Sequence, residues 1–218
     1  EGVPHLHGTT FTPIPDRIEA GTFLLATAAT RGRTRLHNVR ADHLGTVIET
    51  LRTTGVWIDA QGDTLDIDAE GPLHTVDVVA GPYPGFPTDL QAPMGAFLAT
   101  VPGAATIRDD VYPDRFTHVE ELVKLHARLT VDDRTLHVEG AELHANAVHA
   151  ADIRAGGALV VAALAARGVT TLTGVTFLDR GYENLVERLT RLGGRIERHG
   201  TRHEEPSYVH VAHEPTRH

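Results

Sequence analysis

One loop holds a carboxylate in a setting that suits acid–base chemistry. Residues 81–91 read Gly-Pro-Tyr-Pro-Gly-Phe-Pro-Thr-Asp-Leu-Gln, so three prolines and two glycines precede Asp89. Prolines fix backbone torsions and glycines allow tight turns, so a stiff loop would hold this carboxylate at the start of a helix. Two interpretations follow: Asp89 is a general base, or it is an N-cap that accepts hydrogen bonds from free backbone amides.

Three arginines that lie near aspartates have an ordinary structural explanation. Arg115 and Arg180 each follow an aspartate directly, and Arg154 stands two residues after Asp152. In this structural alternative each arginine is a surface charge or ion-pair partner, and Asp152 caps a helix and pairs with Arg154. Spacing alone does not distinguish it from binding of a carboxylate or phosphate, which a planar guanidinium holds through two parallel hydrogen bonds.

Composition narrows the class of protein before any fold is assigned. The 218 residues are 41% hydrophobic and 22% charged, with no cysteine and a formal net charge of −9. These fractions are typical of a folded protein, and the acidic balance argues against nucleic acid as the main ligand. The longest apolar stretch, Gly156–Ala166, is too short to span a bilayer, so no membrane partner is expected. The absence of cysteine fits a reducing compartment, and we expect a cytoplasmic protein.

The chain contains three copies of one unit. Glu-Gly pairs at residues 1, 70 and 139 are each followed by a Leu-His pair, and the glutamates are 69 residues apart. Each copy continues with an aspartate, an apolar stretch of small residues, a glycine and an alternating strand. We therefore predict a single domain over residues 1–218, built from repeats at about residues 9–70, 71–139 and 140–213.

Periodicity within a unit predicts a βαβαββ order. Gly21–Ala29 is apolar nearly all round and predicts a buried helix, as does its counterpart at 155–166. Apolar residues at i, i+3, i+4 and i+7 predict amphipathic helices that include 44–51 and 182–189. A hairpin is expected over 56–68, with left-handed glycines at Gly55 and Gly193 ending the amphipathic helices. The segments 5–15 and 142–150 are the candidate linkers.

The first Glu-Gly pair differs from the later two in what comes before it. In the later copies the Glu-Gly pair follows a strand, whereas nothing precedes Glu1-Gly2. We expect the chain to begin partway through a longer polypeptide, where an earlier unit ended.

Five motifs in register make the chain resemble the UDP-N-acetylglucosamine enolpyruvyl transferases, the 1-carboxyvinyltransferases of peptidoglycan synthesis. The motifs are Pro-Asp-Arg-Ile-Glu-Ala-Gly-Thr-Phe at 15–23, Phe-Pro-Thr-Asp at 86–89, Asp-Arg-Phe at 114–116, Asp-Ile-Arg-Ala at 152–155 and Asp-Arg-Gly-Tyr-Glu at 179–183. The resemblance runs through nearly the whole chain but covers only the C-terminal half of the family's length.

The resemblance implies a mixed α/β (α+β) fold, an inside-out α/β barrel with three βαβαββ repeats around a pseudo-threefold axis. It also implies transfer of the enolpyruvyl group of phosphoenolpyruvate to the 3-hydroxyl of UDP-N-acetylglucosamine, without a metal or organic cofactor. The N-terminal half, which carries the family's catalytic lysine and a cysteine or aspartate on a mobile loop, would be the partner, covalently joined or separate. The chain alone is expected to be inactive.

The same resemblance assigns roles to particular residues. Asp89 matches the base, and Arg115, Arg154 and Arg180 match arginines around phosphoenolpyruvate, with Arg180 as a direct clamp. Two further positions, Asp152 and Val111, match a carboxylate of the site and a contact to the nucleotide sugar. The Asp-Arg pair at 16–17 also matches a motif, and we expect it to be mostly structural.

Departures from the family pattern leave alternatives open. Pro113-Asp114 stands where relatives usually have Glu-Asn, Pro93 lies in a helix's first turns, and residues 125–127 replace a Met-Gly-Ala segment. The chain could instead act on another nucleotide sugar, or be a catalytically silent sugar-binding or scaffold module. The shikimate-pathway enzyme is disfavoured because it typically carries a serine-rich segment in place of the 86–91 loop. Fifteen histidines are scattered without metal-ligand spacing, so we expect solvated or helix-capping histidines and no metal site.

Overall fold

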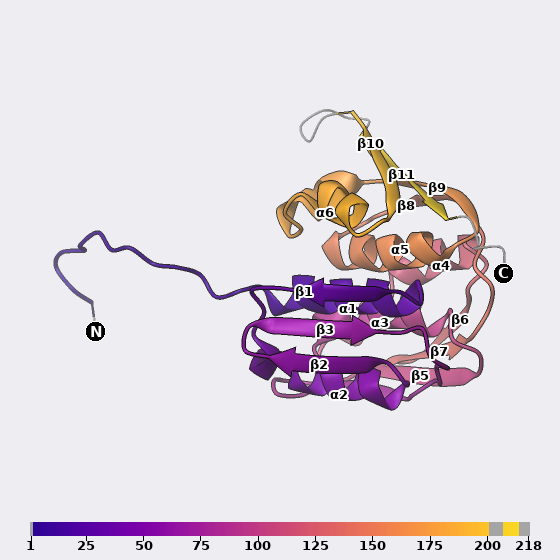
Figure 1. Cartoon of the computed structure of the whole chain (residues 1–218), viewed down its shortest axis with the longest axis horizontal. Coiled ribbons are helices and arrows are strands. Elements are labelled where there is room, and N and C mark those ends of the chain that lie inside the picture. Colours follow the sequence, from indigo (N-terminus) through magenta and orange to yellow (C-terminus); the bar gives the residue numbers. More distant parts are fainter. Residues whose placement is uncertain (1, 201–206, 214–218) are drawn as a thin grey trace.

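Three β-sheets pack around three buried helices in the computed structural model, which describes residues 2–200 and 207–213 (Figure 1). The helices are α1 (Arg17–Ala29), α2 (Gly45–Thr53), α3 (Gln91–Leu98), α4 (His118–Lys124), α5 (Ile153–Ala165) and α6 (Leu185–Arg191), with short 3-10 helices η1 (Ala41–His43), η2 (Thr88–Leu90) and η3 (Val175–Arg180). The strands are β1 (Arg33–Leu36), β2 (Trp57–Gln61), β3 (Thr64–Asp68), β4 (Val78–Ala80), β5 (Ala104–Asp109), β6 (Arg128–Asp132), β7 (Thr135–Glu139), β8 (Ala147–His149), β9 (Gly168–Thr173), β10 (Arg195–His199) and β11 (Tyr208–His213). Together they form the mixed α/β fold that the sequence predicts.

Each sheet belongs to one unit of the predicted repeat. The orders are β4-β5-β7-β6 and β8-β9-β11-β10 in the second and third sheets, where the first strand of each is parallel to its neighbour. The first sheet, β1-β3-β2, has three strands and is antiparallel throughout. The βαβαββ order is therefore complete in the second and third units, whereas the described residues before α1 form no leading strand for the first unit. The repeat boundaries stay a prediction.

Several local predictions are confirmed. A hairpin follows α2, and Gly55 and Gly193 have positive φ at the ends of α2 and α6. Residues 2–14 form an exposed, extended arm without helix or strand, as expected of a linker.

Two local predictions are wrong. The second candidate linker, 142–150, contains β8, which escapes sequence analysis because three residues are too few to show an alternating pattern. The amphipathic spacing that starts at Tyr182 begins too early: α6 starts at Leu185, and Tyr182 is buried before it.

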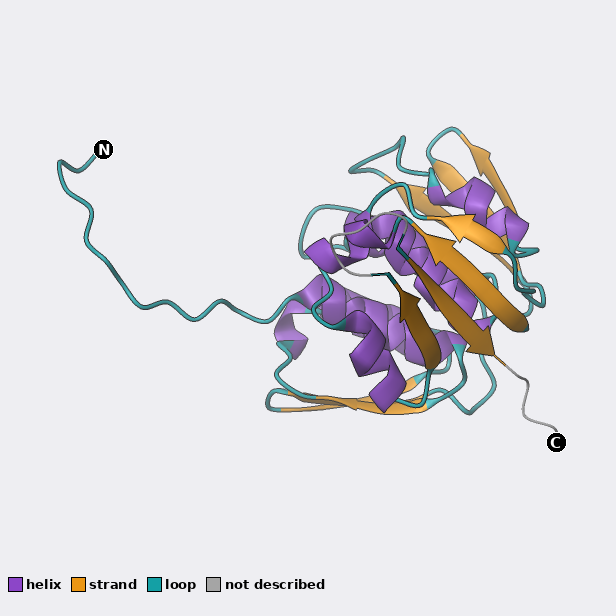
Figure 2. Ribbon diagram, turned by 90° about the horizontal axis from the view of Figure 1, so that it is seen from above, coloured by secondary structure: helices purple, strands orange, loops and turns teal. Residues whose placement is uncertain are grey.

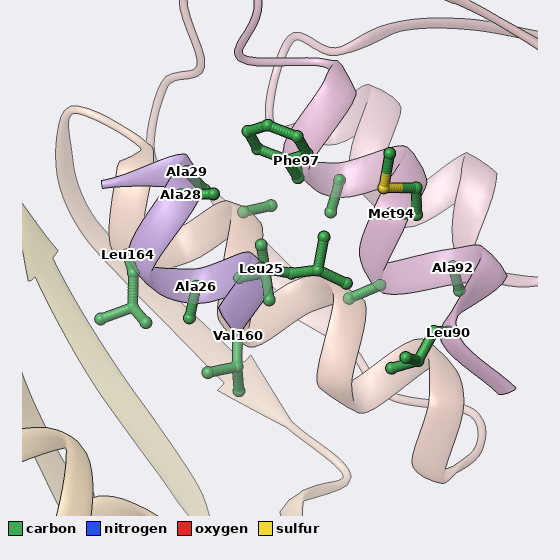
Figure 3. Close-up of a cluster of buried hydrophobic side chains, with 14 of the residues drawn as sticks. Leu25, Ala26, Ala28, Ala29, Leu90, Ala92, Met94, Phe97, Val160 and Leu164 are labelled. Atoms are coloured by element: carbon green, nitrogen blue, oxygen red, sulfur yellow. The ribbon is translucent and has the colours of Figure 1, made fainter. Parts of the chain in front are cut away.

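The centre of the molecule is formed by α1, α3 and α5, which contact one another pairwise. Figure 3 shows apolar side chains that meet between these helices, among them Leu25, Met94 and Phe97, whereas Val160 points to the other side of α5. Because each helix is covered on nearly every side, its sequence is apolar all round, whereas α2 lies outside and is amphipathic.

Glycines in these helices allow side chains of neighbouring elements to pack closely against them. A Cβ added at Gly21 of α1 would lie 2.3 Å from Leu90, and one at Gly157 of α5 would lie 2.6 Å from the hydroxyl of Tyr182. That hydroxyl is 3.0 Å from Oγ1 of Thr22, which itself donates to the carbonyl of Ile18. Tyr182 therefore donates to Thr22 and joins the third unit to the first through a buried hydrogen bond.

We predict that Gly157→Ala lowers the free energy of unfolding by about 1–3 kcal/mol, because the added methyl group displaces the Tyr182 hydroxyl. In a Tyr182→Phe background the same change should cost measurably less, because the oxygen it meets is gone. Urea unfolding of the four chains measures this coupling. Gly45→Ala is the control, since a Cβ there meets nothing within 4 Å. Strictly additive effects would show that Gly157 and Tyr182 do not interact.

Candidate functional site

Asp89 lies in η2, directly before α3, and its side chain joins two arginines from different parts of the chain. Its Oδ1 accepts from Nη1 of Arg115 at 2.5 Å, and its Oδ2 accepts from Nη2 of Arg154 at 2.7 Å. No backbone amide among the described residues donates to this carboxylate, so the N-cap interpretation of Asp89 is wrong. The three side chains are 31%, 26% and 23% exposed, respectively, which leaves them open to a ligand yet partly desolvated.

The position of Arg154 follows from the start of α5. Asp152 is the N-cap of this helix, and its Oδ1 accepts from the backbone amides of Arg154 and Ala155 at 2.7 and 2.9 Å. Its Oδ2 accepts from the hydroxyl of Thr117 at 3.1 Å. Asp152 thus caps the helix, as the structural alternative proposes, but Arg154 pairs with Asp89 rather than with Asp152.

A buried aspartate that sequence reasoning missed fixes the loops around Asp89 and Arg115. Asp109, at the end of β5, accepts from the hydroxyl of Thr88 at 2.6 Å and from the amides of Val111 and Tyr112 at 2.9 and 2.8 Å. The guanidinium of Arg115 lies 4.4 Å from the centre of the Tyr112 ring. The sequence did contain a signal for Asp109, because it is an acidic residue that ends an alternating strand just before Val111, a predicted ligand contact.

Two opposing effects act on the Asp89 carboxyl. Burial raises its pKa, but the charges and hydrogen bonds of Arg154 and Arg115 together outweigh burial and hold the pKa below its usual value. Asp89 is therefore ionised at neutral pH, and both of its oxygens are occupied. A ligand anion that draws the guanidinium groups away would raise the basicity of this carboxylate.

The starts of the three central helices lie close to one another. Asp16 caps α1 by accepting from the amide of Ile18 at 2.7 Å, and Leu90 of η2 packs against Gly21 of α1. Arg17 lies over the ring of Tyr83, 5.7 Å from its centre, in the proline-rich loop. The positive ends of these helix dipoles add to the attraction for an anion near Asp89. The pair at 16–17 has the structural role that we expected.

The remaining predicted residues are not joined to this cluster. Arg180 ends η3 and is exposed, and its side chain makes no hydrogen bond or ion pair to any residue that the structure describes. Val111 is 42% exposed, and its amide is taken by Asp109, so its carbonyl is the backbone group left for a ligand. The structure therefore brings together Asp89, Arg115 and Arg154, with Asp152 behind Arg154.

Two buried polar side chains near the cluster were also missed. The amide of Gln91, two residues after Asp89, is fully buried, and neither of its polar atoms has a partner among the described residues. His118, the first residue of α4, is 1% exposed, and its Nε2 likewise lacks a partner there. Burial lowers the pKa of His118 to about 4, although the charge of Asp152 opposes this. The expectation of solvated histidines is wrong for His118.

The described part of the chain contains neither a cluster of metal-ligating side chains nor a helix able to span a membrane. No three histidine, aspartate or glutamate side chains gather there in an arrangement that could hold a metal ion. Nor does any described helix have the length and apolar character needed to cross a membrane.

The burial of His118 predicts a pH-dependent stability. Between pH 6.5 and 4 the unfolded chain binds a proton here that the folded chain does not, so acidification should cost about 3 kcal/mol of unfolding free energy. His118→Leu should flatten the slope over that window in urea titrations at successive pH values. His137→Leu, on an exposed position of β7, is the matched control and should keep the parent slope. An unchanged slope in His118→Leu would contradict this assignment.

Comparisons with known sequences agree on one family. The family model described as EPSP synthase (3-phosphoshikimate 1-carboxyvinyltransferase) matches residues 1–189. Proteins named UDP-N-acetylglucosamine 1-carboxyvinyltransferase from Deinococcus radiodurans and Thermus thermophilus are each 53% identical over 196 residues. This chain covers 46% of each of them and so spans about half the length of these curated relatives. It covers 82% of a relative with the same name from Desulfofundulus thermocisternus, which is 48% identical.

Solved structures agree with the sequence comparison. The enolpyruvyl transferase NikO from Streptomyces tendae superposes with a TM-score of 0.74 at 33% identity, over 83% of this chain and 43% of that protein. EPSP synthase from Acinetobacter baumannii superposes with a TM-score of 0.67 at 15% identity, which supports the fold alone. By its family model, its relatives and its fold, this chain belongs to the EPSP synthase family of enolpyruvyl transferases.

Proposed function

We propose that this chain is the C-terminal half of an enolpyruvyl transferase that moves the enolpyruvyl group of phosphoenolpyruvate to the 3-hydroxyl of UDP-N-acetylglucosamine. The observation that supports it best is the Asp89 carboxylate held between two guanidinium groups on a partly exposed surface. The names of relatives at 53% identity support the same reaction and acceptor.

In this proposal Asp89 is the general base. The sugar hydroxyl is a poor nucleophile, so its proton must leave as the oxygen bonds to C2 of phosphoenolpyruvate. Asp89 takes that proton while C3 of the donor gains one, and loss of a proton from C3 then accompanies cleavage of the C2–O bond to phosphate. Because Asp89 is paired with both arginines in the free chain, donor binding must first compete for them.

The arginines form the anion clamp in this proposal. Arg115 and Arg154 turn from Asp89 toward the carboxylate and phosphate of phosphoenolpyruvate, and this exchange couples donor binding to activation of the base. Arg180 provides a further guanidinium when the cleft closes. Asp152 holds Arg154 in place by capping α5, and the carbonyl of Val111 contacts the nucleotide sugar.

The other half of the site would come from the N-terminal half of the enzyme. Proton transfer to and from C3 needs an acid that the Asp89 cluster does not provide, because its carboxylate is the base and guanidinium groups stay protonated. Closure of two halves would also exclude water and align the reacting atoms. For this reason we propose that the lone chain is inactive.

The first test measures phosphate release from phosphoenolpyruvate and UDP-N-acetylglucosamine. We expect no turnover by the lone chain and turnover once an N-terminal half is added. In the reconstituted enzyme, Asp89→Asn should lower kcat by about 10²- to 10⁴-fold without loss of folding, because the base is removed. Turnover by the lone chain would contradict the need for a second half. Unchanged turnover in Asp89→Asn would instead contradict the role of this carboxylate.

The second test measures binding of inorganic phosphate to the lone chain by calorimetry. Asp89→Asn should bind phosphate about tenfold more tightly, because the carboxylate that competes for both guanidinium groups is gone. Arg154→Lys should bind more weakly, because bidentate contact is lost. Asp66→Asn is the matched control: this aspartate pairs with Arg35 at 2.5 and 3.0 Å on the surface of the first sheet. Weaker phosphate binding by Asp89→Asn would overturn the clamp.

A further inference from the structure

A cavity of about 310 Å³ lies beside the amphipathic helix of the third unit. Its apolar walls come from η3, from the strands β10 and β11, from α6 and from Val160 of α5. Helix α6 packs against β10, the edge strand of the third sheet (Figures 1 and 2). Val160 points away from the cluster between the central helices (Figure 3). The cavity is therefore separate from both the central core and the Asp89 cluster.

The corresponding helix is packed more fully in the first unit. Val47 and Ile48 of α2 hold the positions of Leu185 and Val186 in the i, i+3, i+4, i+7 pattern. Val47 and Ile48 are 1% and 5% exposed, whereas Leu185 and Val186 are only partly buried. Side chains that α2 buries against its own unit are thus left partly accessible in α6.

The size and walls of the cavity suit an aromatic molecule. Val160, Ile196 and Val209 are aliphatic, line the cavity and are at most 5% exposed. A cavity of about 150 Å³ with such walls is large enough to bind benzene. The volume here is about twice as large, so it corresponds to two fused rings rather than one.

An ion pair gives the cavity a polar wall. Nη1 and Nη2 of Arg198 donate to the two carboxylate oxygens of Asp179, each at 2.7 Å, and both side chains line the cavity. Nε of Arg198 is buried and has no hydrogen-bond partner among the described residues. Because a buried donor without an acceptor is unfavourable, an occupant with one acceptor oxygen would be held at this wall.

The charges around the cavity favour an uncharged occupant. Asp179 and Glu187 would repel an anion, and Arg198 would repel a cation. A charged group would also lose its hydration among the aliphatic side chains. These properties together describe a fused bicyclic aromatic molecule with a single hydroxyl or carbonyl oxygen.

The wall formed by η3 leads directly to Arg180. Leu178 lines the cavity and is 4% exposed, and its carbonyl accepts from the amides of Gly181 and Tyr182 at 3.1 and 2.8 Å. Arg180 ends η3 between these residues, and its side chain is exposed. An occupant that packs against Leu178 would therefore restrain the backbone on both sides of Arg180.

We propose that this cavity is a binding site for an uncharged bicyclic aromatic molecule. Its oxygen accepts a hydrogen bond from Nε of Arg198, and its rings pack against Leu178 and Val186. The bound molecule holds η3, and with it the backbone of Arg180, in one position. Only the consequence for the donor clamp rests on the proposed function; the binding site itself does not.

Fluorescence titration of the full chain with 2-naphthol at neutral pH tests the occupant. Naphthalene should bind about tenfold more weakly, because it cannot accept a hydrogen bond from Arg198. The anion 2-naphthoate should bind at least tenfold more weakly. No saturable binding of 2-naphthol would overturn the proposal. Equal binding of naphthalene would overturn the role of Arg198, and equal binding of 2-naphthoate would overturn the assignment of an uncharged occupant.

A variant that fills the cavity tests its location. Val186→Phe places an aromatic ring in the cavity and should weaken binding of 2-naphthol at least tenfold. Val123→Phe is the matched control on α4, where Val123 is 46% exposed, and should bind as the parent does. Undiminished binding by Val186→Phe would show that 2-naphthol binds elsewhere and would overturn the proposal.

Hydrogen exchange measured by mass spectrometry gives a test that needs no variant. Saturating 2-naphthol should slow the exchange of amides in 177–182 at least threefold, while amides in 57–61 of β2, in another sheet, keep their rates. Unchanged exchange in 177–182 would overturn the link between the cavity and Arg180. These measurements involve neither phosphoenolpyruvate nor turnover, so failure of the proposed reaction leaves their outcome intact and is distinguishable from failure of this site.

Discussion

A carboxylate shared by two guanidinium groups is the interaction on which the interpretation of this protein depends. Asp89 and Arg115 come from the second unit and Arg154 from the third, so their contact requires α3 and α5 to begin at the same end of the molecule. The pairing keeps Asp89 ionised while both of its oxygens accept hydrogen bonds. Its negative charge also balances the charge of the arginines until an anion competes for them. In the proposed reaction, binding of the anionic donor would therefore release the Asp89 carboxylate to act as a base.

The core and the cluster are parts of one arrangement. Gly21 and Gly157 allow side chains of neighbouring elements to approach the central helices closely. The hydrogen bond between Tyr182 and Thr22 joins the first and third units in the same core. Asp109 and Asp152 then fix the loop and the helix end that carry the arginines. Because several of these supports lie between units, the precision of the site depends on the packing of the repeats against one another.

The repeat also shows how the first sheet differs from the other two. Two of its three sheets receive a fourth strand from the segment that leads into the unit, while the first sheet has an open edge beside an extended arm. The chain spans about half the length of these curated relatives.

The sequence by itself determined the repeat, the buried and amphipathic helices, the hairpins and the family, because apolar periodicity and motif order are local properties of the chain. It also singled out Asp89, Arg115 and Arg154, yet it left open whether Asp89 caps a helix. Only the tertiary structure decided that question, since the partners of Asp89 lie 26 and 65 residues away. The roles of Asp109 and His118, the strand β8 and the empty edge of β1 were likewise settled by packing, because each depends on what lies beside it in space.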